Sequence, residues 1–374
     1  MVILQKLRAV FQDVLANVPN QPAYVADDWL LEQTLFVCRN LKNKAPIRFL
    51  LSCLVAKLDK PDVDIRKPYT SIPGTDHYSG RKYDESVVQQ LVTEFRLPCN
   101  STTAYLTPAF RNGNEVMRPG LRLEGRPPEV YAYTLDLLTA VHEGRVEPID
   151  LFREIARQLI IVRDQQTRRI EELVDALSTS VGSQPLSSEQ IITLIEQHLN
   201  CPNASRLPTL VVTAAYRSVE ERMGEYVRTL HAHNAADKQT GALGDIEIRL
   251  LSDERVRTCY EMKGKRVTRN DIDIAVAKVA GQGIGLDNYI VITTEPVEEA
   301  VMQYARSLYA KTGVEFAILN CLDFLRHFLH LFHRHRVSFL EHYQKLVLAE
   351  PDSSVSQPLK EAFLSVRRAA EADE

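Results

Sequence analysis

The sequence lacks several features that would place it in a membrane or a secretory pathway. It contains no uninterrupted apolar run of about 18 residues, the length that a membrane-spanning helix requires. The opening segment, Met1 to Lys6, lacks the long apolar core and small-residue cleavage site of a signal peptide. Hydrophobic residues make up 45% of the chain and charged residues 25%, which is typical of a globular protein. The length of 374 residues predicts two domains, or three. We therefore expect a cytoplasmic, bacterial protein with no membrane partner.

Cysteine is scarce, and an excess of basic residues is absent. The six cysteines form no Cys-x-x-Cys pair and no dense cluster, so the sequence predicts neither a disulfide framework nor a zinc site. The formal net charge is −4. This charge argues against a protein that coats nucleic acid without specificity, because such proteins are usually basic overall. It remains compatible with a DNA enzyme that has a local basic cleft.

Three catalytic patterns are also missing. Gly281-x-Gly283-x-Gly285 follows an expected helix and precedes an expected strand, the reverse of a dinucleotide-binding fingerprint, so we interpret it as a turn. The sequence has no Gly-x-Ser-x-Gly elbow of a serine hydrolase. Four histidines fall in an apolar segment without a His-Glu-x-x-His arrangement, which favours a partly buried amphipathic helix over a metal site. They are His327, His330, His333 and His335.

Helical periodicity dominates the N-terminal half. Apolar residues recur at helical spacing from Met1 to about Lys60 and again from Tyr131 to Leu177. Between Asp62 and Pro128, proline and glycine break every long helix except one at about Asp84 to Arg96. We therefore predict a mainly α-helical domain over residues 1–180 with an irregular, arginine-rich region at 62–128.

A compact α/β pattern follows a small polar linker at about Ser178 to Pro185. Ser187-Ser188-Glu189-Gln190 predicts a capped helix start. The element order predicts a central mixed sheet flanked by helices over 181–350, followed by a polar or helical tail at 351–374. The expected elements are helix Thr209–His231, strands Asp245–Leu251 and Val256–Lys263 joined at Asp253-Glu254, helix Asn270–Val279, strand Tyr289–Thr293, helix Pro296–Ala310, strand Glu315–Leu319 and a long helix Cys321–Leu348.

An acid opens the first of these strands, and Glu-x-Lys closes the second. Glu261 and Lys263 are two residues apart on a strand, so they point to the same face. Hairpin pairing places the start of one strand beside the end of the next, which brings Asp245 near them. The two carboxylates and the backbone carbonyl of Met262 would make a hard oxygen site for Mg²⁺. Lys263 would hold or deprotonate an attacking water and offset the charge of a phosphate.

These residues resemble the PD-(D/E)xK nuclease superfamily, with Gly244-Asp245 in place of Pro-Asp and Glu261-Met262-Lys263 as the second half. The motif is widely shared and specifies only the superfamily. A second resemblance is narrower. The run from Arg66-Lys67-Pro68-Tyr69 through Ser79 to Glu85 and Leu97 to Ala104, and the helical half followed by a nuclease core, look like type II restriction endonucleases of the SacI-like group.

This resemblance implies a site-specific double-stranded DNA endonuclease of a restriction-modification system that defends against phage. Asp245 and Glu261 would hold Mg²⁺ while Lys263 positions the water for in-line attack, and metal and lysine would stabilise the transition state. Palindromic cleavage implies a homodimer with two symmetry-related sites, and a cognate DNA methyltransferase as its companion. A structure-specific or repair nuclease remains an alternative. So does a non-catalytic DNA-binding subunit of a defence complex.

Further acids could join the site. Similar enzymes use a glutamate on the helix before the hairpin; Glu220, Glu221 and Glu225 compete for this role, and Glu225 is our candidate, with residues of a solvated helix face as the alternative. Glu247 shares a strand face with Asp245, so it could be an additional metal-site acid or point into solvent.

The candidate DNA contacts come from two places. The region at 62–128 is rich in side chains that suit base edges and phosphates, with arginine bidentate to guanine as the expected contact; a polar loop system is the alternative, because its charges nearly balance. A basic run that includes Arg266 and Lys278 follows Lys263 and would lie beside the DNA backbone. The candidates for DNA contact are Arg66, Lys67, Arg81, Lys82, Arg111, Arg118, Arg122, Lys265 and Arg269.

Overall fold

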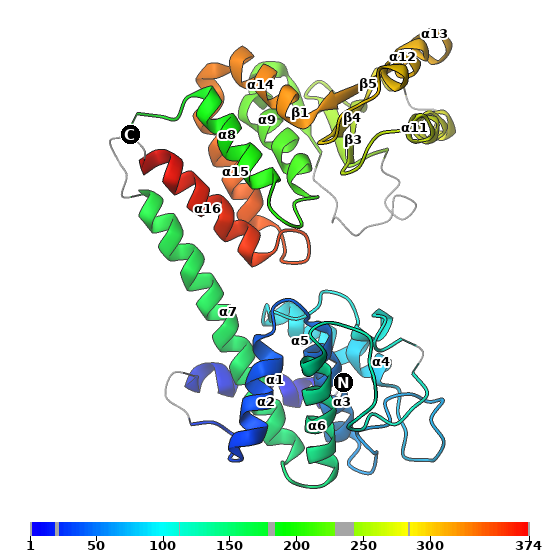
Figure 1. Ribbon diagram of the computed structural model, residues 1–374, viewed down its shortest axis with the longest axis vertical. Helices are drawn as coiled ribbons and strands as arrows, with labels where there is room; N and C mark the ends of the chain where they lie inside the picture. Colours follow the sequence, from blue (N-terminus) through cyan, green and yellow to red (C-terminus); the bar gives the residue numbers. More distant parts are fainter. Residues whose placement is uncertain are drawn as a thin grey trace. The chain divides into compact units, whose positions relative to one another are not determined.

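The computed structural model (Figure 1) describes residues 2–18, 22–111, 113–178, 184–228, 243–282 and 285–372. The chain divides into two compact units, residues 1–169 and 170–374. The boundary falls inside helix α7 (Pro148–Ser178). Over the described residues, none of the helices combines the length and the apolar character needed to cross a membrane.

The first unit is helical, as the sequence predicts. Its elements before α7 are α1 (Val2–Asn17), α2 (Asp28–Arg39), α3 (Ala45–Asp59), α4 (Gly80–Tyr83), η1 (Asp84–Val88), α5 (Gln89–Glu94), η2 (Ala104–Leu106) and α6 (Pro128–His142). Helix α3 lies in the core, since every residue from Ala45 to Ala56 is buried, as befits a helix that is apolar on nearly all sides.

The irregular region at 62–128 contributes to this core. Tyr78, Tyr105 and Phe110 are buried, and the ring of Phe110 stacks on that of Phe49 from α3 with centroids 4.0 Å apart. The Tyr78 hydroxyl donates to the carbonyl of Ile65 at 2.6 Å. The region is therefore a folded layer over α3 with exposed residues on its outer side, not only a set of surface loops.

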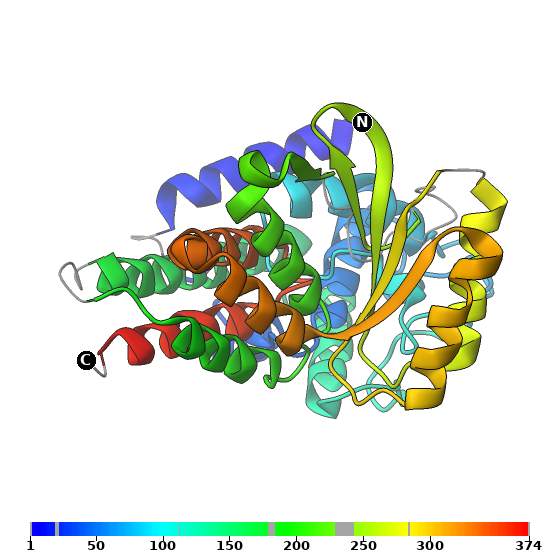
Figure 2. The ribbon, with the colours of Figure 1, turned by 90° about the horizontal axis from the view of Figure 1, so that it is seen from above.

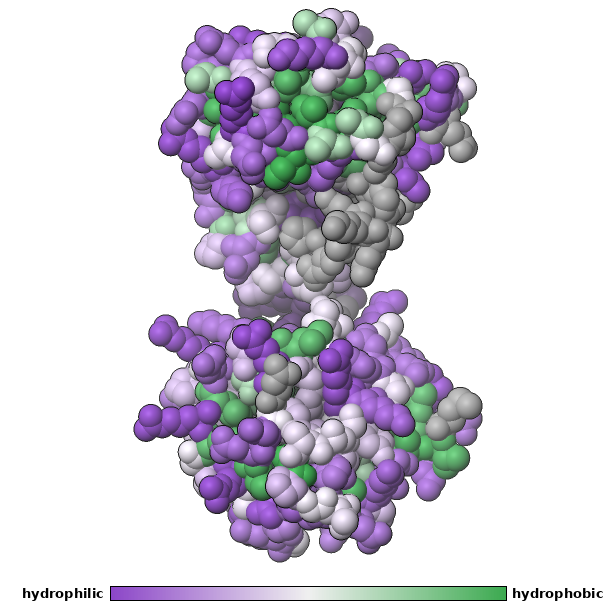
Figure 3. Space-filling view, turned by 90° about the vertical axis from the view of Figure 1, so that its right-hand side faces the viewer, coloured by the Kyte–Doolittle hydropathy of each residue, from purple (hydrophilic) through white to green (hydrophobic). Residues whose placement is uncertain are grey.

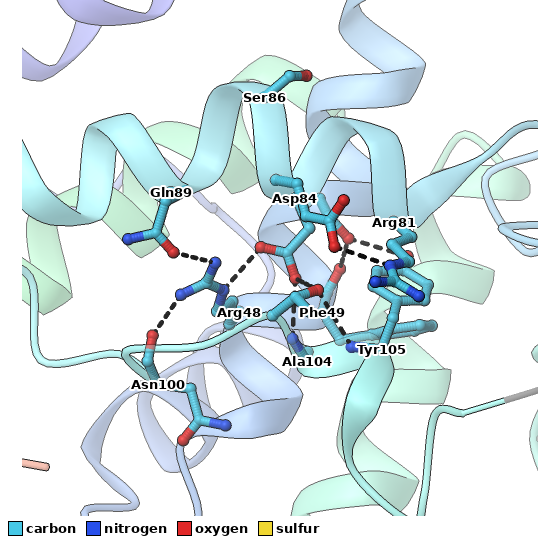
Figure 4. Close-up of polar contacts among 12 residues, drawn as sticks. Arg48, Phe49, Arg81, Asp84, Ser86, Gln89, Asn100, Ala104 and Tyr105 are labelled. Atoms are coloured by element: carbon cyan, nitrogen blue, oxygen red, sulfur yellow. Dashed lines mark hydrogen bonds and ion pairs between the residues drawn. The ribbon is translucent and has the colours of Figure 1, made fainter. Parts of the chain in front are cut away.

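A buried ion pair connects α3 to this layer (Figure 4). Arg48 and Asp84 have fully buried side chains, and Arg48 Nε donates to Asp84 Oδ1 at 2.7 Å. Arg48 also donates to the side chain of Gln89 and the carbonyl of Asn100. The second Asp84 oxygen accepts from the backbone amide of Ala104 at 2.9 Å and from a neighbouring threonine hydroxyl. A buried charge pair is tolerated only when such bonds satisfy both partners.

The second unit is built on a five-stranded sheet. Its strands are β1 (Glu225–Val227), β2 (Ile246–Leu250), β3 (Asp253–Lys263), β4 (Asn288–Thr293) and β5 (Glu315–Asn320), in the spatial order β1-β2-β3-β4-β5. Strand β2 is antiparallel to both of its neighbours, β1 and β3, and β3, β4 and β5 are parallel. This confirms the mixed sheet that the sequence predicts and adds β1, which the sequence analysis missed.

Helices cover both faces of the sheet (Figure 2). Two hydrophobic clusters separate the faces: one includes Ile246, Tyr260 and Ile292, and the other includes Cys259 and Val291. On the first face, α9 (Leu207–Met223) and α14 (Cys321–Leu331) contact the strands. Helices α8 (Ser188–Leu199), α15 (Arg336–Ala349) and α16 (Gln357–Ala372) belong to the same hydrophobic cluster. The second packs against α11 (Arg269–Gln282) and α12 (Glu299–Ser307), and the short helix α13 (Tyr309–Thr312) follows α12. On the side seen in Figure 3, the surface of each unit is mostly hydrophilic with scattered apolar patches.

Several boundaries differ from expectation for local reasons. The helix expected over Thr209–His231 ends at Met223, because Gly224 takes the left-handed conformation (φ 69°) that terminates helices. Asp253 already pairs with Leu250, so the hairpin turn lies at residues 251–252. The capping box of Ser187 and Gln190 is present as predicted.

The long helix expected over Cys321–Leu348 is interrupted. Phe332 leaves helical geometry (φ −113°, ψ 42°), and the short helix η3 (His333–His335) separates α14 from α15. The rest of the comparison falls partly on residues that the structure does not describe: 229–231 of the expected helix, 179–183 of the expected linker, and 283–284 of the expected glycine turn.

A buried histidine joins three helices of the second unit. His198 is fully buried, and its Nε2 donates to the carbonyl of Leu359 at 3.0 Å while the Tyr343 hydroxyl donates to Nδ1 at 3.0 Å. A neutral ring satisfies both bonds, with Nε2 as the donor and Nδ1 as the acceptor. Burial lowers the pKa of His198 to about 4, because a charged imidazolium is poorly solvated in an apolar interior.

We expect this histidine to make the second unit sensitive to acid. The unfolded chain takes up the proton near pH 6.5 and the folded chain only near pH 4, so the contribution is complete above about pH 6.5 and declines as the pH falls toward 4. The loss amounts to roughly 3 kcal/mol. Calorimetry of the wild type and His198→Gln across this range measures it, with exposed His330→Gln as the control. Equal pH dependence in wild type and His198→Gln would contradict the assignment.

Candidate active site

The hairpin of β2 and β3 brings the predicted acids together. Ile246 pairs with Tyr260, so the residue before Ile246, Asp245, stands opposite Glu261. Asp245 Oδ2 accepts a hydrogen bond from the amide of Met262 at 2.7 Å. Gly244 permits this approach, because a Cβ there would lie 2.6 Å from the carbonyl oxygen of Tyr260.

Strand alternation sets the face of the site. Tyr260 belongs to the core cluster on the α9 side, whereas Cys259 belongs to the cluster on the α11 side. Glu261 and Lys263 follow Cys259 at intervals of two residues, so they point toward α11. Asp245, opposite Glu261 in the hairpin, lies on the same side. The predicted arrangement of Asp245, Glu261 and Lys263 on one face of the sheet is therefore present.

Glu261 is held through both of its oxygens. Oε1 lies 3.2 Å from Lys263 Nζ, and Oε2 lies 3.3 Å from Lys278 Nζ of helix α11. The Tyr289 hydroxyl of β4 donates to Oε2 at 3.1 Å. Burial raises the pKa of Tyr289, and the charge of Glu261 raises it further. The phenol therefore stays protonated and acts as a donor to the carboxylate.

Lys263 has a second acidic neighbour on α11. Its Nζ lies 3.7 Å from Asp271 Oδ1. Asp271 Oδ2 accepts from the Thr268 amide at 2.9 Å and from the Thr268 hydroxyl at 2.6 Å, at the N-terminus of the helix. Partial burial opposes ionisation of Asp271, but the Thr268 hydrogen bonds and the charge of Lys263 outweigh it and leave the pKa below its usual value. Asp271 is therefore ionised near neutral pH.

Glu247 is buried, and both of its carboxylate oxygens have protein partners. It shares the face of Asp245, as expected, but it is buried, so it does not point into solvent. Its Oε1 accepts from the amide of Leu243 at 3.1 Å, and its Oε2 pairs with Arg228 Nη1 at 3.0 Å. The two oxygens of Glu247 thus contact Leu243 and Arg228, residues that lie fifteen apart in the sequence.

Glu225 lies on the opposite face from Asp245, contrary to our expectation. It begins β1 instead of ending a helix, because Gly224 has already turned the chain. Two residues later, Val227 pairs with Ile248 and joins the core on the α9 side. Glu225 shares that side, where the pKa of Tyr260 is raised mainly by burial and, to a smaller extent, by the charge of Glu225. Burial raises the pKa of Glu225 itself.

Among the basic residues that follow Lys263, some contact other side chains and one is exposed. Arg266 pairs with Glu298 at 2.8 Å, and the guanidinium of Arg269 lies 3.9 Å above the ring of Tyr304. Lys265 is exposed. Lys278, which we expected beside the DNA backbone, contacts Glu261. Neither its sequence neighbours nor the motif signals this contact, since it depends on where α11 crosses the sheet.

The candidate DNA contacts in the first unit divide into two groups. Arg66 pairs with Asp64, Lys67 with Asp76, and Arg81 with Glu85, each at 2.7–2.8 Å. The other candidates have exposed side chains in or beside the irregular region; they are Lys82, Arg111, Arg118 and Arg122. Arg81 is also exposed, whereas Arg66 and Lys67 are half-buried.

The histidine segment behaves as an amphipathic helix. Leu325, Phe328 and Leu329 of α14 are buried, and the exposed His330 contacts Glu189 at 2.9 Å. Across the described parts of the chain, His, Cys, Asp and Glu nowhere gather in a group of three suited to a metal ion.

The fold and this geometry define an α/β core in which a hairpin acid and Glu-x-Lys share one sheet face. Residues 183–293 match the family model of the SacI restriction endonuclease C-terminal domain. Within the C-terminal unit, this segment of the chain is thus similar to a restriction-endonuclease domain. The matched span is less than a third of the 374 residues and includes Asp245, Glu261 and Lys263. A search among curated proteins found no match.

Proposed function

We propose that the chain is a type II restriction enzyme that hydrolyses double-stranded DNA at specific sites with Mg²⁺. One observation carries the proposal: Asp245 and Glu261 face each other across the β2–β3 hairpin, with Lys263 Nζ 3.2 Å from Glu261. The restriction-endonuclease family match includes all three residues.

The donor set at this place fits magnesium. The carboxylates of Asp245 and Glu261 and the carbonyl of Met262 are oxygen ligands, which Mg²⁺ prefers. This ion commonly binds through one or two carboxylates and completes its shell with water and substrate phosphate. When bound, the ion would polarise the scissile phosphate and stabilise the charge that develops on it.

The chain's own residues would orient the reaction. Lys263 Nζ would hold or deprotonate the attacking water, and its positive charge would stabilise the developing negative charge. Asp271 limits where the lysine can point, because it lies 3.7 Å from Nζ. The Tyr289 hydroxyl, on the neighbouring parallel strand β4, donates to Glu261 and would orient its carboxylate before substrate binds.

Substrate recognition would fall to the helical part. In this proposal residues 1–180 recognise DNA, with the region 62–128 contacting base edges, residues 181–350 form the nuclease domain, and 351–374 form a C-terminal extension. Cleavage of both strands of a palindrome would need two copies of the chain related by two-fold symmetry. A methyltransferase with the same specificity would protect the host DNA.

Cleavage patterns test this function. We expect discrete fragments from unmethylated phage DNA in the presence of Mg²⁺, and intact DNA when EDTA replaces the metal. Branched and flap substrates that lack the recognition sequence should remain uncut. Cutting of such structures without discrete fragments from linear DNA would instead identify a structure-specific nuclease. Binding without cutting would indicate a non-catalytic subunit.

A further inference from the structure

Helix α11 contacts both members of the Glu-x-Lys motif with residues of opposite charge. Asp271 lies 3.7 Å from Lys263, and Lys278 lies 3.3 Å from Glu261. Asp271 and Lys278 are seven residues apart, which is close to two helical turns and places them on the same side of the helix. One helix face therefore presents an acid to the motif's lysine and a lysine to its glutamate.

These four side chains are only partly accessible to water. Their exposed fractions are 24% for Lys263, 17% for Glu261, 24% for Lys278 and 12% for Asp271. Charges in such positions are screened less than charges on an open surface. Their mutual energies should therefore affect any ion that binds at Glu261.

The position of Lys278 places a fixed positive charge where a divalent cation would share the same carboxylate. A cation on Glu261 must compete with this ammonium and is repelled by it. Asp271 has the opposite effect, because it adds negative charge and attracts Lys263. The alternative is that Lys278 serves only to hold Glu261 in place, in which case losing it would weaken metal binding.

We propose that Lys278 is a built-in counter-ion of Glu261 that competes with the divalent metal and sets the metal affinity of the site. The inference rests on the proposed function only in taking Asp245 and Glu261 as the metal ligands. It predicts opposite effects for two residues of one helix.

The expected changes follow from the charges. Lys278→Met removes the competing charge and should tighten Mn²⁺ binding by roughly tenfold, which corresponds to about 1.4 kcal/mol. Lys278→Gln, a second neutral replacement, should behave alike. Lys278→Arg keeps the charge and should leave the affinity within about twofold of the wild type. Asp271→Asn should weaken binding severalfold.

The experiment is calorimetric titration of the full chain with MnCl₂, without DNA and at low ionic strength. Asp273→Asn is the matched control for Asp271→Asn, since Asp273 lies on the same helix but accepts from the Tyr304 hydroxyl. Lys311→Met on α13 is the control for Lys278→Met, because Lys311 is exposed. Both controls should bind Mn²⁺ as the wild type does.

The outcomes separate this inference from the proposed function. Tighter binding by both neutral Lys278 variants supports the counter-ion role, even if the wild type cuts no DNA or binds Mn²⁺ too weakly to measure. Unchanged or weaker binding by these variants overturns it, even if the wild type cuts DNA at specific sites. Failure of the wild type and both neutral variants to bind Mn²⁺ would also overturn it.

Discussion

Lys263→Met should lower the single-turnover rate of DNA cleavage by about 10²–10⁴-fold, the range expected for loss of a general acid–base group. The methionine keeps the length of the side chain but removes the ammonium that lies 3.2 Å from Glu261. Affinity for the cleavable DNA in the absence of metal should change little, because a single charge contributes only part of the phosphate attraction. Rapid-quench kinetics with enzyme in excess measure the rate directly.

The matched control for this prediction is Lys311→Met. Lys311 lies on α13 in the same unit and is exposed, so its loss removes an equal charge without touching the hairpin. We expect wild-type cleavage from it. A Lys263→Met rate within threefold of the control would remove Lys263 from the chemistry and leave only the acids of the hairpin.

Asp84→Ala should lower the free energy of unfolding of the first unit by about 3–5 kcal/mol, because it leaves the guanidinium of Arg48 buried without its counter-charge. The substitution also removes the acceptor of the hydrogen bond from the Ala104 amide. Urea unfolding followed by fluorescence reports on this unit, since Trp29 is the only tryptophan of the chain and lies on α2.

Glu85→Ala is the control for Asp84→Ala. Glu85 is the next residue, but its pair with Arg81 is about half exposed on both sides. Exposed pairs of this kind contribute no more than about 0.5 kcal/mol. Similar decreases in the free energy of unfolding for the two variants would show that the buried network of Figure 4 stabilises the unit no more than an exposed ion pair does.

The arrangement of the acids could be predicted because it depends on local rules. Strand alternation puts Glu261 and Lys263 on one face, and hairpin pairing brings the start of β2 beside the end of β3. Two register shifts between Ile248 and Leu250, which the sequence did not predict, complete the pairing that sets Asp245 opposite Glu261. The order of helices and strands then determines a mixed sheet. None of these steps needs knowledge of contacts distant in sequence.

The errors arise where one residue changes the chain's direction. Gly224 ends α9 in a left-handed conformation, and strand β1 follows at once. Glu225, its first residue, therefore lies on the sheet face opposite Asp245. Phe332 likewise divides the expected long helix. A periodic pattern alone does not show such breaks, because the apolar residues continue on both sides of them.

Contacts between charged residues distant in the sequence could not be predicted either. Lys278 could be assigned to a helix from the sequence, but its contact with Glu261 depends on how α11 crosses the sheet. The pairing of Arg48 with Asp84 spans 36 residues and joins a helix to an irregular region. Charge alone would place both residues on a surface, and only tertiary packing explains their burial.

Digestion of unmethylated phage DNA with Mg²⁺ by the wild type and Asp245→Ala tests the central claim most directly. The account predicts discrete fragments from the wild type, and intact DNA from the variant with its thermal stability retained, since Asp245 is exposed and lies directly before β2. Fragments of the same pattern from Asp245→Ala would contradict it, because the cutting centre would then lie elsewhere in the chain.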